Sequence, residues 1–300
     1  MNMPAVCPSS PTTTPSARWL VLGATGFIGS HTIAALKTQG RTVVGLSRST
    51  TPGLDILDRN RLRELLRKYQ PTILLNACGP TPATSANLTD FFSRSTLAIL
   101  EAAAMEVPVC RVVLLGSAAE YGHSEAPLGS LETDPLRPLS EYGRTKCRQF
   151  ELAEQFSARG LAVTTARLFN PIGPGQGRHQ LVGGLLNRIR QGERPLRVRQ
   201  GNCIRDWLDV RDAARAIIML AESNASPSVV NVCSGRGQTV EFIARAVAQQ
   251  MQVEIDFEPL PASPTELARS VGNPTRIFSL GWQPHYDLNR TIADQCRHDA

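Results

Sequence analysis

Three residues of the 300-residue sequence have the types and spacing of a proton-transfer site: Ser117, Tyr142 and Lys146. Ser117 directly follows an apolar run, and Tyr142 and Lys146 are four residues apart, so that a helix would place both on one face. A free tyrosine has a pKa of about 10, and a neighbouring ammonium favours the phenolate and lowers that pKa. We therefore expect Tyr142 to exchange a proton with a substrate oxygen near neutral pH, while Ser117 hydrogen-bonds the same oxygen. Because a YxxxK spacing is also common on solvated helix faces, this assignment depends on a cofactor site elsewhere in the chain.

A glycine-rich turn near the start of the chain has the spacing of such a cofactor site. The apolar residues 18–22 lead into the string GATGFIG, after which apolar residues recur at helical spacing. In a strand–turn–helix unit, glycines allow the backbone to approach a pyrophosphate closely, and the helix N-terminus directs free N–H groups at the anion. The string therefore favours a dinucleotide site over a purely structural turn. The predicted contact residues are Gly23, Thr25, Gly26, Phe27, Ile28 and Gly29.

The end of the second predicted strand indicates which dinucleotide is bound. About 20 residues after the glycines, an NAD site usually places an acidic side chain on the ribose 2′-hydroxyl. Here the string is Leu-Ser-Arg-Ser at 46–49, and Arg48 can pair with a 2′-phosphate, which favours NADP(H) over NAD(H). A solvated surface arginine is the alternative. Asp55 is predicted either to accept a hydrogen bond from the adenine amino group or to cap a helix. The cofactor contacts predicted beyond the glycine-rich turn are Arg48, Asp55, Ile56, Ala77, Gly79, Tyr142, Lys146 and Asn170.

The elements that position these residues alternate along the first half of the chain. Short apolar runs predict strands at 18–22, 41–46, 72–77, 110–115 and 161–168. Helical spacing predicts helices at 27–39, 58–69, 89–105 and 141–159. Alternating strands and helices predict an α/β fold, a Rossmann-type doubly wound parallel sheet over residues 18–169.

The two ends of the chain have a different character. Residues 1–17 are rich in Pro, Ser and Thr and are expected to form a flexible tail. Residues 170–300 are expected to form mainly a smaller C-terminal substrate-binding lobe, with some segments returning to the sheet. Helical patterns in this part occur at 180–191, 210–222 and 240–250.

The composition is that of a globular protein. Apolar residues make up 42% and charged residues 19% of the chain, and a chain of this length buries about 75% of its unfolded surface without disulfides or metals. The net charge of +6 suits a nucleic-acid binder but equally an enzyme of anionic substrates. Seven cysteines without a CxxC pair indicate reduced thiols in a cytoplasmic protein and no metal site. Neither a signal peptide nor an apolar run of about 18 residues, the length of a membrane helix, is recognisable.

The glycine-rich turn, the serine after a strand and the YxxxK spacing follow one another along the chain. In that order they resemble the extended short-chain dehydrogenase/reductase family, specifically its nucleotide-sugar branch. The resemblance extends from Leu20 to about Pro284. Besides the glycine-rich turn and the YxxxK spacing, four strings carry it: GSAAEYG at 116–122, RLFNPIGPGQ at 167–176, RDWLDVRD at 205–212 and RSVGNPTRIFSLGWQP at 269–284. The resemblance implies that Ser117, Tyr142 and Lys146 are catalytic and that a sugar-nucleotide pocket begins in the second string.

Three reactions compete within that branch. The family's 4,6-dehydratases carry an Asp and a Glu directly after the catalytic Ser or Thr, where this chain has Ala118 and Ala119, so elimination of water lacks its acid and base. The 4-epimerases and the 4-keto-6-deoxysugar reductases need only Ser, Tyr and Lys. The strings look closest to the GDP-4-keto-6-deoxymannose reductases, and reductases of the branch commonly use NADPH, which fits Arg48. We therefore expect NADPH-dependent reduction of a nucleotide-linked 4-keto-6-deoxyhexose. A 4-epimerase with tightly bound NAD and a non-catalytic dinucleotide-sensing or nucleic-acid-binding protein are the alternatives.

The resemblance also indicates where the substrate binds. The implied substrate contacts are Ser117, Ala118, Asn170, Arg205 and Arg269. The planar guanidinium groups of the two arginines suit a diphosphate, because they bind it bidentately. The alternatives are that Asn170 satisfies loop backbone groups and that Arg205 pairs with Asp206 or Asp209.

The chain departs from the family at two positions, and the resemblance implies one partner. Phe92 stands where the family usually has an asparagine, and Asn273 where it usually has an aspartate. Family members commonly dimerise through the helix that carries the tyrosine and lysine, so a homodimer without membrane or nucleic-acid partners is expected. Of 32 basic residues only Lys37, Lys68 and Lys146 are lysines. Lys146 is the one for which arginine would be a poor replacement.

Overall fold

A six-stranded parallel sheet forms the centre of the computed structural model, which describes residues 17–79, 88–123, 126, 128–199, 202–223, 227–254, 256–260 and 267–298. The strands lie in the order β10–β5–β4–β3–β1–β2, and every neighbouring pair is parallel. This arrangement confirms the predicted Rossmann-type α/β fold. The strands are β1 (Arg18–Leu22), β2 (Thr42–Leu46), β3 (Ile73–Asn76), β4 (Arg111–Ser117), β5 (Val163–Leu168) and β10 (Val229–Val232).

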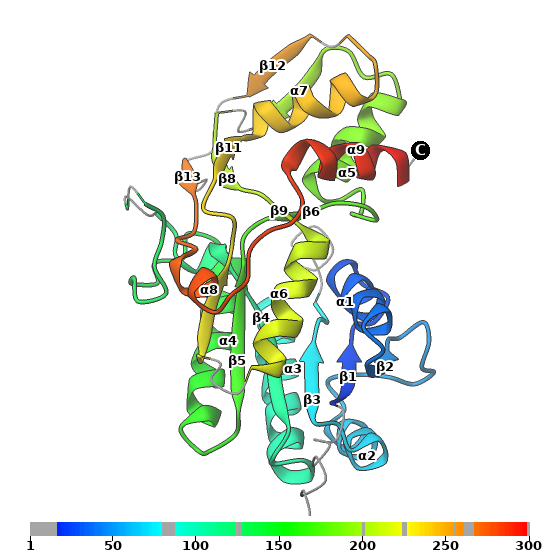
Figure 1. Ribbon diagram of the computed structural model, residues 1–300, viewed down its shortest axis with the longest axis vertical. Coiled ribbons are helices and arrows are strands. Elements are labelled where there is room, and N and C mark those ends of the chain that lie inside the picture. Colours follow the sequence, from blue (N-terminus) through cyan, green and yellow to red (C-terminus); the bar gives the residue numbers. More distant parts are fainter. Residues whose placement is uncertain are drawn as a thin grey trace, which may run out of the picture.

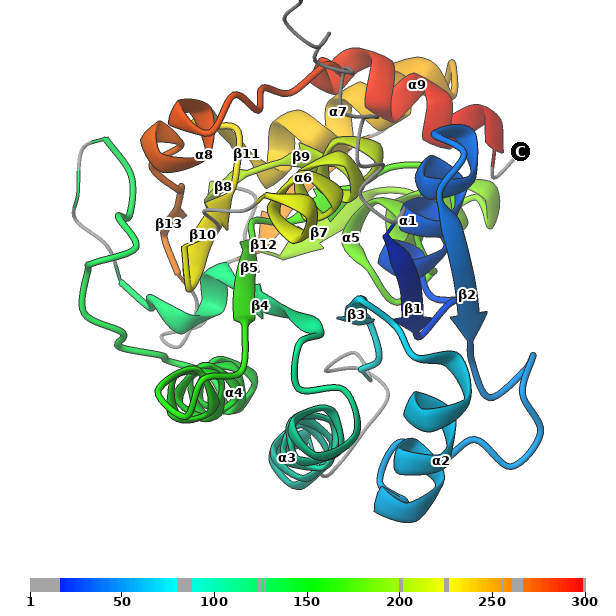
Figure 2. The same ribbon diagram turned by 60° about the horizontal axis from the view of Figure 1, so that its bottom comes forward.

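Helices cover both faces of the sheet, which is why its strands are almost wholly apolar. Figure 2 shows α2 (Arg59–Tyr69), α3 (Leu88–Glu106) and α4 (Glu141–Ser157) on one side of the strands, and α6 (Val210–Glu222) on the other, where it packs on α1 (Phe27–Thr38). Each face of the sheet has its own hydrophobic core, and the side chains of β1 alternate between the two. Leu20 and Leu22 belong to the core beneath α2, α3 and α4, and Trp19 and Val21 belong to the core beneath α1 and α6. The helix α6 and the strand β10 come from the C-terminal half of the chain.

A smaller lobe with a core of its own lies beyond the carboxyl ends of the strands (Figure 1). Helices α5 (Leu181–Arg190), α7 (Val240–Gln250) and α9 (Leu288–His298) enclose that core. Three small sheets join it, in the orders β11–β8–β13, β12–β7 and β6–β9. Their strands are β6 (Pro171–Ile172), β7 (Leu196–Arg199), β8 (Ile204–Asp206), β9 (Leu208–Asp209), β11 (Gly237–Thr239), β12 (Phe257–Leu260) and β13 (Arg269–Ser270).

Two short helical segments complete the description. The 3-10 turn η1 (Ala118–Glu120) follows β4, and α8 (Thr275–Ser279) follows β13. Of the helices in the described ranges, none has both the length and the apolar character that would let it cross a membrane.

Candidate active site

The glycine-rich turn leads from β1 into α1, where the sequence predicts a pyrophosphate site. Gly23 has a φ of 83°, and a Cβ atom there would lie 2.6 Å from the carbonyl carbon of Ala77. A Cβ atom at Gly29 would collide with the carbonyl oxygen of Gly23. The backbone of β1 can therefore turn directly against the end of β3. Gly26 is the N-cap of α1, and no side chain caps this helix, so its first N–H groups can bind a pyrophosphate.

The loop after β2 lies beside this turn. The hydroxyl oxygens of Thr25 and Ser49 are 3.3 Å apart, and that of Ser47 is 2.9 Å from Ser49. Between them, Arg48 is exposed, and no hydrogen bond or ion pair is found for it among the described residues. The structure thus places Arg48 next to the predicted dinucleotide site with its guanidinium group available.

The loop before α2 contains the next predicted cofactor residues. The carboxylate of Asp55 accepts a hydrogen bond from the Leu57 amide at 2.9 Å, and Ile56 is buried. The cap of α2 is Asp58, which accepts from the amides of Asn60 and Arg61. Capping, the alternative role considered for Asp55, is therefore performed by Asp58. The exposed Asp55 stays a predicted adenine contact.

Ser117, Tyr142 and Lys146 meet at the carboxyl end of β4. Ser117 is the last residue of β4, and Tyr142 lies in the first turn of α4, where Ser140 caps the helix. The phenol of Tyr142 and the hydroxyl of Ser117 are hydrogen-bonded. Gly143 permits this approach, because a Cβ atom there would lie 2.5 Å from the carbonyl oxygen of Ala119. The structure thus brings the three predicted catalytic residues together, and Gly143 is a requirement that the sequence analysis missed.

The protonation states of the pair differ from the sequence-based expectation. The pKa of Tyr142 is raised to about 12: burial is the largest cause, the Ser117 hydrogen bond opposes it, and the carboxylate of Glu120 adds to it. Burial also lowers the pKa of Lys146 to about 8, with Glu120 acting in the opposite direction. The expectation of a lowered pKa for Tyr142 is therefore wrong in direction, because burial of the phenol outweighs the other effects. The hydrogen bonds of the ammonium are also directed elsewhere: it donates to the Leu115 carbonyl oxygen at 2.8 Å and to Gln149 Oε1 at 3.1 Å.

The buried ion pair between Glu120 and Arg167 contacts the backbone of Ser117. The sequence analysis did not predict this pair. Glu120 Oε1 accepts a hydrogen bond from the Ser117 amide at 2.6 Å, and Oε2 accepts from Arg167 Nε at 2.7 Å. Arg167 Nη1 donates to the Tyr121 hydroxyl at 2.6 Å, which in turn donates to Asn231 Oδ1 at 2.7 Å. The side chains of Glu120 and Arg167 are 0% exposed. The network connects β4, β5 and β10 next to Ser117, the predicted catalytic serine.

A cavity of about 420 Å³ is lined by the segment that follows β5 and by residues of the lobe. Its lining residues are Asn170, Pro171, Ile172, Gln176, Gln180, Leu181, Arg205, Trp207 and Val240. Asn170 Nδ2 donates to the Asp206 carbonyl oxygen at 3.0 Å, so the structure shows the backbone-satisfying role that was the alternative for this residue.

The two predicted arginines are not brought together. In the parallel pairing of β8 and β13, Arg269 is opposite Ile204 and Ser270 is opposite Arg205. Because side chains alternate along a strand, Arg205 and Arg269 project from opposite faces of this small sheet. Arg205 lines the cavity, whereas Arg269 donates to the Ala126 carbonyl oxygen at 3.1 Å.

The two aspartates considered as alternative partners of Arg205 bind other groups. Asp206 accepts hydrogen bonds from the amides of Ser234, Gly235 and Gly272. Asp209 pairs with Arg211. Ala118, the remaining predicted substrate contact, is buried at the start of η1 beside Ser117.

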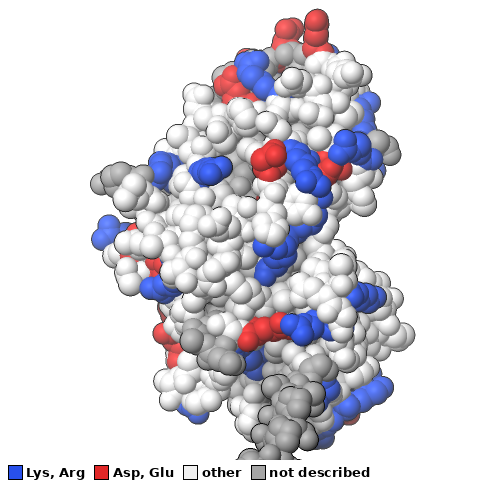
Figure 3. Space-filling model, in the orientation of Figure 1, with Lys and Arg blue, Asp and Glu red and all other residues white. Residues whose placement is uncertain are grey.

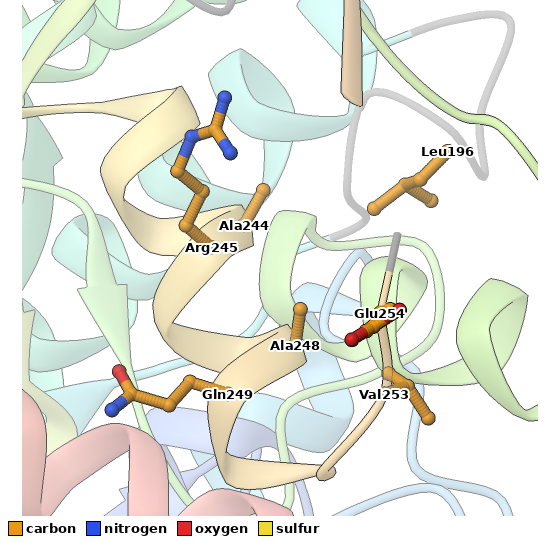
Figure 4. Close-up of a pocket in the computed structure, with 7 residues that line it drawn as sticks. All are labelled: Leu196, Ala244, Arg245, Ala248, Gln249, Val253 and Glu254. Atoms are coloured by element: carbon orange, nitrogen blue, oxygen red, sulfur yellow. The ribbon is translucent and has the colours of Figure 1, made fainter. Parts of the chain in front are cut away.

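A second cavity, of about 340 Å³, lies along α7 in the lobe (Figure 4). Leu196, Ala244 and Ala248 are among its lining residues, which include none of the predicted site residues. The cavity that contains Asn170 and Arg205 is therefore the candidate substrate site. Among the described residues no group of three or more His, Cys, Asp or Glu side chains could hold a metal ion.

The surface charge is divided into small groups. On the face in Figure 3, basic side chains lie in small clusters, several of them beside acidic ones, with wide uncharged areas between them. Arg211, for example, pairs with both Asp209 and Asp294. This face therefore gives no support to the nucleic-acid-binding alternative, which would use a continuous basic surface.

Comparison with known proteins agrees with this geometry. The model of the NAD dependent epimerase/dehydratase family matches residues 19–233. The chain belongs to this family. The match confirms the resemblance to the extended short-chain dehydrogenase/reductases and their nucleotide-sugar branch.

Relatives in the family carry out different reactions. The dTDP-6-deoxy-L-talose 4-dehydrogenase (NAD(P)(+)) of Kitasatospora kifunensis is 28% identical, over 95% of this chain and 96% of the relative. The GDP-6-deoxy-D-mannose reductase of Pseudomonas aeruginosa is 27% identical, over 92% of this chain and 94% of the relative. The solved structure of the Thermus thermophilus UDP-glucose 4-epimerase in complex with NAD superposes with a TM-score of 0.85 and 26% identity, covering 94% of this chain and 98% of that one. A nicotinamide dinucleotide is thus the cofactor class of the family.

Proposed function

We propose that the protein uses NADPH to reduce the 4-keto group of a nucleotide-linked 4-keto-6-deoxyhexose. The observation that carries the proposal is the meeting of Ser117, Tyr142 and Lys146 at the carboxyl end of β4, where the Tyr142 phenol, its pKa raised to about 12, is hydrogen-bonded to Ser117. Such a phenol is fully protonated at neutral pH and can donate a proton to a carbonyl oxygen. Oxidation of an alcohol would use the same residue in reverse, as the phenolate, so the reductive direction is supported by the exposed Arg48 beside the glycine-rich turn, which suits the 2′-phosphate of NADPH.

The chain's own groups have defined parts in this reaction. The nicotinamide, when bound, supplies the hydride that goes to C4. Ser117 and Tyr142 would both hydrogen-bond the 4-keto oxygen, and Tyr142 would transfer its proton to that oxygen as the hydride arrives. Lys146, charged below its pKa of about 8, would then stabilise the phenolate that Tyr142 becomes, because opposite charges in a buried site attract strongly.

The acidic residues near the site argue against a 4,6-dehydratase. Ala118 and Ala119 occupy the two positions directly after Ser117 and carry no acid or base. The nearest following carboxylate, Glu120, is fully buried and bound to Arg167. It therefore cannot take a proton from a substrate in the cavity.

The cavity that Arg205 lines supports a nucleotide-diphosphate substrate. A guanidinium group at its wall suits a diphosphate. Gln176, Gln180 and Trp207 add polar and aromatic surface of the kind that binds a nucleoside. The dTDP-6-deoxy-L-talose 4-dehydrogenase among the relatives is named for the oxidation of a 6-deoxysugar at C4, which is the reverse of the proposed reduction.

A 4-epimerase is the second candidate, because the superposition on a UDP-glucose 4-epimerase is close and the same three catalytic residues suffice for that reaction. An epimerase would copurify with bound NAD and consume no cofactor. The two candidates can therefore be separated by cofactor stoichiometry.

The decisive experiment supplies the full-length protein with NADPH and with GDP-, dTDP- or UDP-linked 4-keto-6-deoxyhexoses. We expect loss of the NADPH absorbance in step with formation of the 6-deoxyhexose product for at least one nucleotide. Constant NADPH with all three substrates, together with interconversion of UDP-glucose and UDP-galactose, would exclude the reductase in favour of the epimerase.

Arg48 provides a test of the proposed cofactor preference. Arg48→Ala is expected to weaken NADPH binding by about 10- to 100-fold, because a hydrogen-bonded charge pair with the 2′-phosphate contributes about 1.5–3 kcal/mol. Affinity for NADH should be unchanged, since NADH has no 2′-phosphate. Titration of NADPH and NADH by calorimetry measures both, and Arg61→Ala on α2 is the control. An equal loss for both dinucleotides would contradict the assignment.

The pKa of Lys146 predicts the pH dependence of the reduction. Because its pKa is lowered to about 8, the ammonium is present below that pH and is lost as pH rises through it. We expect kcat to be nearly constant between pH 6 and about 8 and to fall about tenfold per pH unit above it. Lys146→Arg should be slower but should lose this alkaline limb, since guanidinium keeps its charge. A wild-type profile that is flat to about pH 10 would contradict this role of Lys146.

A further inference from the structure

The ring of Phe92 lies at the junction of three parts of the site. Phe92 projects from α3 and is only 3% exposed. Its Cε1 and Cζ atoms fill the space where a Cβ atom of Gly79 would lie, 2.7 Å from each. Gly79 is one of the predicted cofactor contacts, so the ring links the loop after β3 to the catalytic helix α4.

The ammonium of Lys146 is placed over this ring. Its Nζ atom lies 4.2 Å from the centroid of Phe92. An ammonium has three donors. Two are used by the Leu115 carbonyl oxygen and by Gln149 Oε1, which leaves the third for the negative face of the ring. A cation at this distance from a desolvated aromatic ring is attracted to it.

The same ring contacts the catalytic tyrosine. The centroids of Phe92 and Tyr142 are 6.1 Å apart with an angle of 72° between the planes, an edge-to-face pair. Such a pair limits the orientations that the tyrosine ring can adopt. Phe92 therefore contacts both members of the catalytic pair, from a helix 54 residues upstream of Lys146.

We propose that Phe92 is a positioning residue that keeps Lys146 charged and oriented beside Tyr142. The family resemblance implies an asparagine at position 92. In this chain the aromatic face of phenylalanine would perform the positioning role instead. The other groups around the ammonium are the Leu115 carbonyl oxygen on β4, Glu120 on η1, and Tyr142 and Gln149 on α4. Of these, Glu120 is the nearby carboxylate, and it is already bound to Arg167. The inference rests on the proposed function only in giving Lys146 a catalytic task.

The small number of lysines makes a direct test practical. Lysine labelled with ¹³C at Cε gives one NMR signal for each of Lys37, Lys68 and Lys146. The variants Lys37→Arg and Lys68→Arg assign the two exposed lysines, so the third signal reports the titration of Lys146. The measurement uses the full chain and requires neither sugar nor cofactor.

Phe92→Leu keeps an apolar side chain but removes the aromatic face. We expect the pKa of Lys146 to fall by about one unit in this variant, because the desolvated cation–π contact that favours the ammonium is lost. Phe156→Leu is the matched control: it removes a buried phenylalanine from α4 in the main core, and it should leave the titration of Lys146 in place.

Fluorinated phenylalanines test the same point without a change of shape. With one and then three ring fluorines placed at position 92 only, the pKa of Lys146 should fall stepwise as the ring face becomes less negative. An unchanged pKa across this series, or an equal fall in Phe156→Leu, would overturn the proposal. A positive titration result combined with no turnover of any keto-sugar would reject the proposed function while the role of Phe92 stands.

Discussion

Tyr142→Phe is expected to lower kcat for the reduction of a 4-keto-6-deoxysugar nucleotide by about 10²- to 10⁴-fold, the usual contribution of a positioned proton donor. The change removes the hydroxyl that we propose delivers a proton to the 4-keto oxygen. The ring itself remains, and its edge-to-face contact with Phe92 is kept. Consumption of NADPH in the steady state measures the loss. NADPH binding, measured by calorimetry, should stay within a factor of a few of wild type.

The control for this variant is Tyr69→Phe, which removes the same hydroxyl from α2, far along the chain from the catalytic motif. It should keep full turnover. If Tyr142→Phe also kept wild-type kcat, the proton would have to come from another group, and Tyr142 would lose the role assigned to it. A loss of NADPH binding in parallel with kcat would instead indicate a damaged cofactor site.

Much of the fold could be predicted because its signals are local. The run of apolar residues in β1 and the glycines that follow it specify a strand–turn–helix unit without reference to the rest of the chain. Ser117, Tyr142 and Lys146 could be selected for a related reason, since a strand end and a helical spacing of four place them at one edge of a parallel sheet.

The environment of those residues could not be predicted, because it depends on contacts between distant segments. Phe92 reaches Lys146 from α3, and Arg167 reaches Glu120 from β5. Neither contact leaves a periodic signal. The pKa of Tyr142 was expected to fall because Lys146 is near in sequence, whereas burial decides its direction.

The predicted substrate contacts also depend on an interaction between distant segments, namely the pairing of the short strands β8 and β13. Arg205 and Arg269 both belong to motifs that resemble the family, and both carry the charge that a diphosphate needs. Their side chains nevertheless project from opposite faces, because the register pairs Arg269 with Ile204. A shift of one residue would reverse this result. Residues 207–268 separate the two strands, so no single tight turn between them sets the register.

Glu120→Ala is expected to destabilise the protein by about 3–5 kcal/mol, because it leaves a buried guanidinium without its counter-ion. Arg167 would keep the Tyr121 hydroxyl as a partner, but a neutral hydroxyl does not compensate a charge at 0% exposure. Urea unfolding measures the change. The control is Glu151→Ala, which breaks the Arg148–Glu151 pair, whose side chains are 50% and 56% exposed. It should cost less than about 1 kcal/mol.

Two further variants separate the charge of Glu120 from its hydrogen bond to Ser117. Glu120→Gln removes the charge but can still accept from the Ser117 amide, so it should be less stable than wild type yet keep most of kcat. Glu120→Ala with Arg167→Met removes both charges, and it should recover part of the lost stability, since a buried pair is often replaceable by apolar side chains. The double variant should still be slow, because the amide that fixes Ser117 has lost its acceptor. Recovery of kcat along with stability would mean that the pair only fills the core, and that Ser117 is positioned by β4 and η1 alone.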